Sequence, residues 1–176
     1  MNRAVQYPFF PIVDRFNTQD SIPNIIVNNL EQVLPLFPSE IVIDTLENDF
    51  VFTTRYEKGG GSEDDTLITF IGNKFFSKLG NILFSLRISD ILYTYLIGKT
   101  SSFNLLNIKS NDFTFCVELP IKMELQKMKY KCLPSFEKKR IAGKKKVNAF
   151  IDGFLILLEM IKLFINFKIF RNKVID

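Results

Sequence analysis

The side chains that could do chemistry in this chain are carboxylates, cations and two thiols. Its 176 residues include no histidine, which excludes catalytic triads, imidazole bases and histidine-ligated metals. Cys116 and Cys132 lack the spacing of a zinc site, and we expect both to be reduced, buried thiols. Any catalysis would therefore rest on carboxylates, cations, backbone dipoles or a carboxylate-bound metal. The transfer of phosphate-activated sugars can proceed with those parts alone.

Positive charge gathers toward the carboxy-terminal end of the chain. The formal net charge is only +4, but a dense basic run extends from Lys138 to Lys146, whereas the segment from Asp44 to Asp65 is acid-rich. This asymmetry predicts an anionic partner for the carboxy-terminal end. We expect no nucleic acid as that partner, because no aromatic side chains alternate with the cations and no RNA-binding motif is visible.

The elements that would position these groups begin with a strand over Asn48 to Tyr56. It is apolar on both faces, which predicts a sheet covered on both sides. Gly59-Gly60-Gly61 then predicts a mobile loop. Apolar residues at helical spacing predict a helix from Thr66 to Phe84 with its phenylalanine-rich pattern in the core, and Ser62 with Asp65 can cap its start.

The remaining segments give weaker signals. Proline residues interrupt the first 45 residues, where a short helix can run from Ile22 to Leu34. Ile91 to Ile97 is consistent with a short strand or a helix, and so is Phe113 to Glu118. We expect a further strand from Lys129 to Pro134.

The apolar stretch from Val147 to Phe170 has nearly the length of a membrane span, but charged residues interrupt it. Asp152, Glu159 and Asn166 are spaced seven apart and share one narrow face, which leaves a broad apolar arc. This pattern suits a helix in a membrane interface, or against a partner helix, better than a helix that crosses the lipid.

Five short motifs follow one another between Asp49 and Lys146. They are Phe52-Thr53-Thr54-Arg55-Tyr56 with Gly59-Gly60-Gly61, then Gly72-Asn73, Ile88-Ser89-Asp90, Glu118-Leu119-Pro120-Ile121, and Arg140 with Gly143-Lys144-Lys145. In this order, and with these gaps, they resemble the GSRY-GG, GAN, VSD, EVPI and R-x-x-G-x-S-K segments of family-2 glycosyltransferases of the dolichol-phosphate mannosyltransferase type. The chain looks like the carboxy-terminal half of such an enzyme.

The resemblance implies an α/β fold, here a partial GT-A-like domain for nucleotide-diphospho-sugar transfer, with a nucleotide sugar as donor and a polyprenyl phosphate or other membrane-linked group as acceptor. It implies the following site residues: Arg55, Arg140, Lys144 and Lys145 as contacts to the acceptor phosphate, Gly59, Gly60 and Gly61 as the acceptor loop, and Asp90 as a catalytic base or organiser. It also implies a divalent metal, Mg²⁺ or Mn²⁺, whose ligands cannot be identified in this chain.

The sequence also departs from the family pattern. Asp14-Arg15-Phe16 stands where an Asp-x-Asp metal motif is expected, Thr94-Tyr95-Leu96 replaces a Gly-Phe-Arg segment, and a lysine replaces the closing serine. We therefore expect a fragment, a divergent relative, or one part of a split enzyme whose other half a second chain supplies. The alternative is a non-catalytic, membrane-associated scaffold or subunit.

The predicted organisation has three parts. Residues 1–45 form a divergent amino-terminal segment, residues 46–146 a glycosyltransferase-like α/β region, and residues 147–176 an amphipathic helix at the membrane interface. The expected location is cytoplasmic and peripheral to an anionic membrane surface.

Overall fold

The structure is a computed structural model that describes residue 44 and residues 47–139 and 148–173. This part of the chain has a mixed α/β fold with a small mixed sheet and four helices. In chain order the elements are β1 (Phe50–Thr54), β2 (Gly61–Ser62), α4 (Leu67–Phe84), β3 (Leu96–Gly98), α5 (Thr100–Leu105), α6 (Phe115–Leu125), β4 (Tyr130–Pro134), β5 (Phe136–Glu137) and α7 (Ile151–Lys173).

The strand β1 is the centre of the main sheet. It pairs antiparallel with β3 on one side and parallel with β4 on the other, so that Phe50 lies opposite both Gly98 and Tyr130. Every residue of β1 is buried, which confirms the prediction of a strand covered on both faces. The predicted strand at Lys129 to Pro134 is also confirmed, as β4.

The start of β1 is held by one side chain. Asp49 accepts a hydrogen bond from Ser102 Oγ at 2.7 Å and another from the backbone N–H of Lys129 at 2.9 Å. The first bond comes from α5 and the second from the residue before β4. Asp49 therefore fixes three segments at one end of the sheet and leaves the other end, where Arg55 follows β1, for the site.

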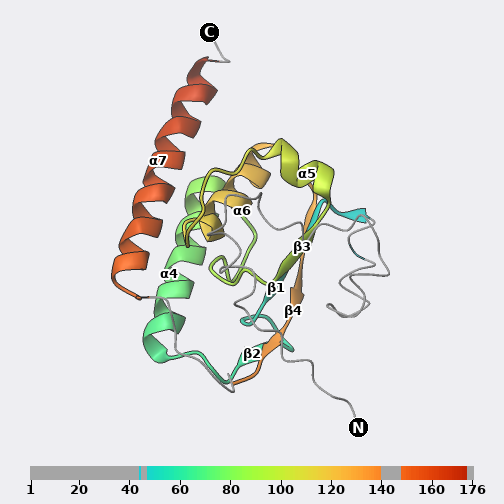
Figure 1. Cartoon of the computed structure of the whole chain (residues 1–176), viewed down its shortest axis with the longest axis vertical. Coiled ribbons are helices and arrows are strands. Elements are labelled where there is room, and N and C mark those ends of the chain that lie inside the picture. The colour runs from blue at the N-terminus through green and yellow to red at the C-terminus, as the bar shows by residue number, and fades with distance from the viewer. Residues whose placement is uncertain (1–43, 45–46, 140–147, 174–176) are drawn as a thin grey trace.

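The helices α4 and α7 lie side by side on one side of the sheet, and α6 lies between them and the strands (Figure 1). The core fills this space with side chains of β1, the turn after α4, α6 and the inner face of α7. None of the helices that the structure describes combines the length and the apolar character needed to cross a bilayer.

The predicted helix from Thr66 to Phe84 is confirmed, but the prediction of its cap is wrong. The prediction that its phenylalanines lie in the core holds for Phe76 and Phe84 and fails for Phe70 and Phe75, which are exposed. Thr66 and Thr69 cap each other reciprocally. Ser62 instead accepts hydrogen bonds from the N–H groups of Asp64 and Asp65 in the turn before the helix. The buried residues of α4 are Asn73, Phe76, Ser77, Gly80 and Phe84.

Most of the apolar residues that predicted a core helix in α4 instead face outward. Leu67 is 73% exposed, Ile71 57% and Phe75 53%. The reason is that the opposite face carries small side chains, which allow close approach: a Cβ at Gly80 would lie only 3.0 Å from Ile91 and 3.2 Å from Leu86. The small residues Ser77 and Gly80 therefore pack inside together with Phe76 and Phe84, while most of the other large apolar residues of α4 lie outside.

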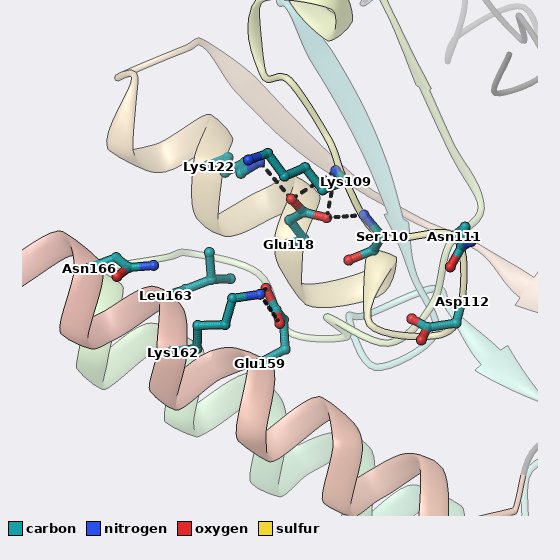
Figure 2. A pocket seen from close by; sticks show the side chains of 10 residues that line it. All are labelled: Lys109, Ser110, Asn111, Asp112, Glu118, Lys122, Glu159, Lys162, Leu163 and Asn166. Carbon is teal, nitrogen blue, oxygen red and sulfur yellow. Dashed lines mark hydrogen bonds and ion pairs between the residues drawn. The ribbon is translucent and has the colours of Figure 1, made fainter.

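Glu118 fixes α6, the helix that begins within the predicted segment from Phe113 to Glu118. Its buried carboxylate accepts hydrogen bonds from the N–H groups of Lys109 and Ser110, the latter at 2.7 Å, and pairs with Lys122 Nζ at 2.6 Å (Figure 2). These contacts lie at one side of a pocket of about 350 Å³ between the loop before α6 and α7. Because its partners satisfy this carboxylate, we interpret Glu118 as a structural anchor.

Candidate functional site

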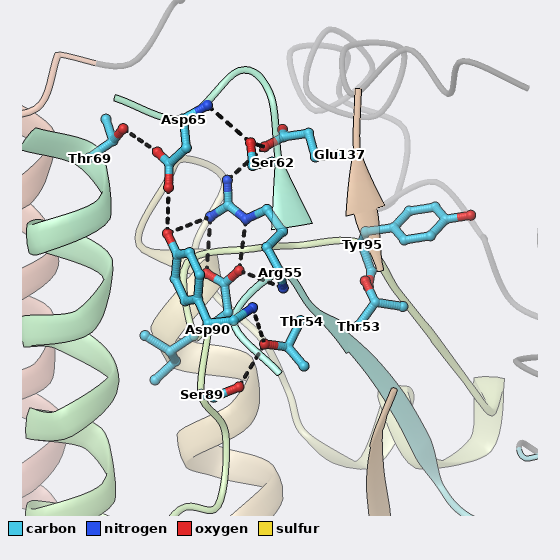
Figure 3. A network of polar contacts seen from close by, with 12 residues as sticks. Thr53, Thr54, Arg55, Ser62, Asp65, Thr69, Ser89, Asp90, Tyr95 and Glu137 are labelled. Atoms are coloured by element: carbon cyan, nitrogen blue, oxygen red, sulfur yellow. Dashed lines mark hydrogen bonds and ion pairs between the residues drawn. The ribbon is translucent and has the colours of Figure 1, made fainter. Parts of the chain in front are cut away.

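A buried arginine at the end of β1 is the centre of the candidate site. Arg55 donates from Nε to Asp90 Oδ2 at 2.7 Å and from Nη2 to Asp90 Oδ1 at 3.0 Å, so the pair is bidentate (Figure 3). The backbone N–H of Arg55 also donates to Asp90 Oδ2, at 3.2 Å. Two of the predicted site residues, separated by 35 positions in sequence, are thus in direct contact.

Two threonines of β1 bring the loop that carries Asp90 to this place. Thr53 bonds the carbonyl of Tyr95 with both its N–H, at 3.0 Å, and its hydroxyl, at 2.6 Å. Thr54 Oγ1 shares a 2.6 Å hydrogen bond with Ser89 Oγ. On the far side of Asp90, the N–H of Ile91 donates to Ser77 of α4 at 2.9 Å. The loop is held on both sides, so Asp90 has a fixed position.

Aromatic rings cover the guanidinium group. Its central carbon lies 4.5 Å from the centre of the Tyr93 ring and 5.2 Å from that of Tyr56. The Tyr56 hydroxyl donates to Asp65 at 2.6 Å, and Asp65 in turn accepts from Thr69 in the first turn of α4. The network therefore joins the end of β1 to the start of α4.

A second carboxylate reaches the remaining part of Arg55. Glu137 Oε2 accepts hydrogen bonds from Arg55 Nη1 at 2.8 Å and from Ser62 Oγ at 2.6 Å. The pairing of β2 with β5 places Glu137 there, with Ser62 opposite it in the register. The side chain of Glu137 is 24% exposed, whereas that of Asp90 is fully buried. One carboxylate is therefore enclosed, and the other is accessible from solvent.

The electrostatics of the pair support a positioning role for Asp90. Desolvation would lower the pKa of Arg55, but its hydrogen bonds to Asp90 and Glu137 raise that pKa above the ordinary value. Burial raises the pKa of the Asp90 carboxyl, and the hydrogen bonds from Arg55 oppose this shift. Both oxygens of Asp90 are engaged by Arg55, so we interpret Asp90 as the organiser of the arginine rather than as a base.

The three glycines that predicted a mobile loop have specific places beside Arg55. Gly59 adopts a left-handed φ of +96°. A Cβ at Gly60 would lie 2.7 Å from the carbonyl oxygen of Thr54 and 2.9 Å from that of Arg55. Gly61 begins β2. Glycine is therefore required at Gly59 and Gly60 by the path of the backbone, which turns tightly over the end of β1.

Sequence reasoning missed four polar members of the network as functional residues. They are Tyr56, Ser62, Asp65 and Glu137. Ser62 and Glu137 are 75 positions apart and meet through the pairing of β2 with β5, which are two residues long, so their spacing carries no signal. Tyr56 and Asp65 are only nine positions apart, but they belong to no common element whose period would predict their contact.

Asn73, part of the Gly72-Asn73 element, adds a buried amide near the network. Thr69, Asn73 and Ser77 are four residues apart, so they share one face of α4. Thr69 bonds Asp65 and Ser77 bonds Ile91, and Asn73 lies between them. Asn73 is 7% exposed, and its Oδ1 has no hydrogen-bond partner in the described part of the chain.

Several predicted residues lie outside the described residues: Arg140, Lys144 and Lys145, the predicted helix from Ile22 to Leu34, and the segment Asp14-Arg15-Phe16. The chain just before Arg140 is described. It follows β5, and the N–H of Lys139 donates to Glu63 at 3.3 Å. The basic run therefore starts beside the site.

The described residues offer no group of three or more Asp, Glu or Cys side chains that could hold a metal. They give no ligand set for the divalent ion that the resemblance implies, and we derive no step through it. Both cysteines are free thiols, as expected, and burial raises the pKa of each to about 12. Cys116 is buried and Cys132 is partly exposed.

Comparisons of the chain with protein-family models, with curated proteins and with solved structures found no match.

Proposed function

We propose that this chain is the acceptor-binding part of a GT-A-like, family-2-type glycosyltransferase that moves a sugar from a nucleotide donor to a lipid-linked phosphate. The proposal rests on the following observation. Arg55, Asp90 and the glycine loop meet at the end of β1, and the chain that leads into the basic run passes beside them. These parts belong to motifs that lie far apart in sequence.

The contacts of Glu137 indicate where an anion would bind. Arg55 Nη1 and Ser62 Oγ both donate to a single carboxylate oxygen, Glu137 Oε2. We call these two donors the anion cradle. A phosphate oxygen has the same hydrogen-bonding chemistry and carries more charge, so it can take the place of the accessible Glu137 carboxylate. Asp90 would hold Arg55 in place during this exchange.

The reaction needs little acid–base help from the protein. An acceptor phosphate is already ionised, so its oxygen can attack the anomeric carbon of the donor sugar while the bond from that carbon to the nucleotide diphosphate breaks. The electron pair of that bond leaves with the diphosphate. Arg55 and Ser62 would orient the attacking phosphate and offset its charge, and Asp90 would act as a positioning residue.

The test is a transfer assay on the full chain, with labelled nucleotide sugars, a polyprenyl phosphate in detergent and either Mg²⁺ or Mn²⁺. Ser62→Ala removes one donor of the anion cradle. We expect kcat/KM for the acceptor to fall roughly tenfold or more, because hydrogen bonds to charged groups contribute about 1.5–3 kcal/mol. Glu137→Gln weakens the internal competitor, so KM for the acceptor should fall while kcat is unchanged.

The matched control is Glu47→Gln. Glu47 is an exposed glutamate just before the start of β1, at the end of the strand away from Arg55. This variant should leave both parameters unchanged. If the wild-type chain neither binds a nucleotide sugar nor transfers the sugar with either metal, the transferase proposal is wrong for this chain alone. That result would favour the non-catalytic, membrane-associated scaffold.

A further inference from the structure

Helix α4 presents an apolar face to solvent. The exposed residues follow at helical spacing and are aliphatic or aromatic. They are Leu67, Ile68, Ile71, Phe75 and Ile82. These residues point away from the buried face of Asn73, Gly80 and Phe84, so the helix is apolar on the side where a helix of a water-exposed protein is ordinarily polar.

Helix α7 also exposes apolar residues, in addition to those that it buries. Its inner face packs into the core through Ile156, Met160 and Leu163. The exposed apolar residues on its outer side are Phe150 just before the helix, then Ile151, Phe154, Leu155, Leu158, Ile161 and Ile165. Phe150 is 81% exposed and Ile151 62%, the highest exposures among the large apolar residues of this region.

The two exposed faces adjoin. The helices α4 and α7 run parallel, because successive contacts join Phe76 to Gly153, Gly80 to Met160 and Phe84 to Phe164. From this line of contact, the helical spacing places Phe75 of α4 and Phe154 of α7 on the same side of the pair, opposite the core. Figure 1 shows the pair at the edge of the molecule, with the sheet beyond it. We call this surface the α4–α7 face.

Exposed lysines accompany the apolar residues of the α4–α7 face. Lys74 and Lys78 are exposed on α4, and Lys162 is exposed on α7. Lys138 and Lys139 are exposed as well, and the N–H of Lys139 bonds Glu63, just before α4. The basic run in the sequence leads from there to Asn148, which caps the start of α7. The described residues at the end where both helices begin thus include the cations Lys138 and Lys139 together with the acids Glu63 and Asp152.

We propose that the α4–α7 face docks on an anionic lipid bilayer, with the apolar side chains among the acyl chains and the lysines at the headgroups. A contiguous exposed apolar surface marks an interaction site. Protein interfaces favour Tyr, Trp and Arg and contain frequent hydrogen bonds. The large exposed apolar side chains of the α4–α7 face are all Ile, Leu or Phe and are accompanied by lysines, which is the pattern of helices that lie in a membrane interface. The inference does not depend on the proposed transfer reaction.

The α4–α7 face borders the Arg55 network. The ring of Phe70 in α4 packs edge-on against Tyr56 at 5.1 Å, and Lys74 Nζ lies 4.4 Å from the centre of the Tyr56 ring. Tyr56 in turn covers the Arg55 guanidinium. Docking would thus bring the Arg55 network close to the headgroup region, where a lipid-linked phosphate lies.

The experiment measures sedimentation of the full chain with vesicles of phosphatidylcholine alone and with added phosphatidylserine, in the absence of any sugar donor. We expect binding to the anionic vesicles that salt weakens. Ile71→Asp and Phe154→Asp should each reduce the partition coefficient at least about tenfold, because each removes a large apolar side chain from the lipid. The matched control is Leu105→Asp on α5, which is 67% exposed but outside the face, and it should bind normally.

A second measurement identifies what covers the face. Ile71→Cys is labelled with a fluorophore that reports the polarity around it, and we expect a blue shift only when anionic vesicles are added. If the emission is already blue-shifted without vesicles and does not change with them, protein covers the face and the bilayer proposal is wrong. Size-exclusion chromatography would then show whether the cover is a second copy. Equal binding by Ile71→Asp and the wild type would also overturn the proposal.

Discussion

The amide oxygen of Asn73 is buried in α4 without a hydrogen-bond partner among the described residues. An unsatisfied buried polar group costs about 1–3 kcal/mol. We therefore expect Asn73→Leu, which is similar in volume, to raise the free energy of unfolding by about 1 kcal/mol in a denaturant titration. A loss of stability would instead show that the amide has a partner in solution.

The glycines offer a pair of matched substitutions. A Cβ at Gly60 would contact backbone carbonyls at less than 3.0 Å, whereas one at Gly72 in α4 meets nothing within 4 Å. We expect Gly60→Ala to destabilise the protein by about 1–3 kcal/mol. Gly72→Ala should stabilise it by about 0.5–1 kcal/mol, since alanine is the better helix former. Thermal unfolding of both variants checks the contrast, which fails if the two shift in the same direction.

At this scale two of the residues that the sequence motifs single out are in contact in the structure, while their roles stay a prediction. Arg55 and Asp90 were both predicted, from separate motifs, and the structure joins them. That they bind each other could not be predicted, because their contact depends on the bonds from Thr53 and Thr54 to the loop before β3. Such side-chain contacts leave no periodic pattern in a sequence.

At the scale of elements, Glu118 ties α6 to the loop at Lys109 and Ser110. Burial alone would raise the pKa of Glu118, but its bonds to Lys122 and Ser110 lower it below the usual 4.5. The stability it contributes is therefore present above its unfolded pKa and is lost as the pH falls through the folded pKa. We expect the wild type to lose stability below about pH 4.5 in part for this reason.

The variant Glu118→Gln separates this contribution from other acid effects. At pH 7 it should lower the free energy of unfolding by about 1–3 kcal/mol, and the difference from wild type should shrink as the pH falls. Urea titrations at several pH values measure it. Glu124→Gln on the same helix is the control. A difference that stays constant with pH would contradict the assigned pKa direction.

Elements with a strong local pattern were predicted well, but the packing of these elements against one another was not. The strand at Phe50–Thr54 and the helix at Leu67–Phe84 follow from β-branched runs and apolar spacing. The buried face of α4 was predicted only in part, because periodicity identifies an apolar face without saying what covers it. In α4 the small residues Ser77 and Gly80 pack inside, and Phe75 faces outward.

At the scale of the whole molecule, the predicted mixed α/β class is confirmed, while a GT-A-like domain remains part of the proposal. The side-by-side arrangement of α4 and α7 could not be predicted, since it depends on contacts between residues far apart in sequence, such as the edge-on packing of Phe84 against Phe164. The apolar pattern of each helix does not say which other helix will pack against it. The α4–α7 face and its vesicle test therefore follow from the tertiary structure, not from the amphipathic pattern of one helix.

The parallel pairing of β1 with β4 also has a consequence for how the chain is made. Phe50 pairs with Tyr130, and Ser62 with Glu137. During synthesis the ribosome releases β1 long before β4 exists, so its hydrophobic strand has only β3 as a partner for a long stretch of translation. The guanidinium of Arg55 can bind its second carboxylate only after residue 137 has left the ribosome, because that carboxylate belongs to Glu137.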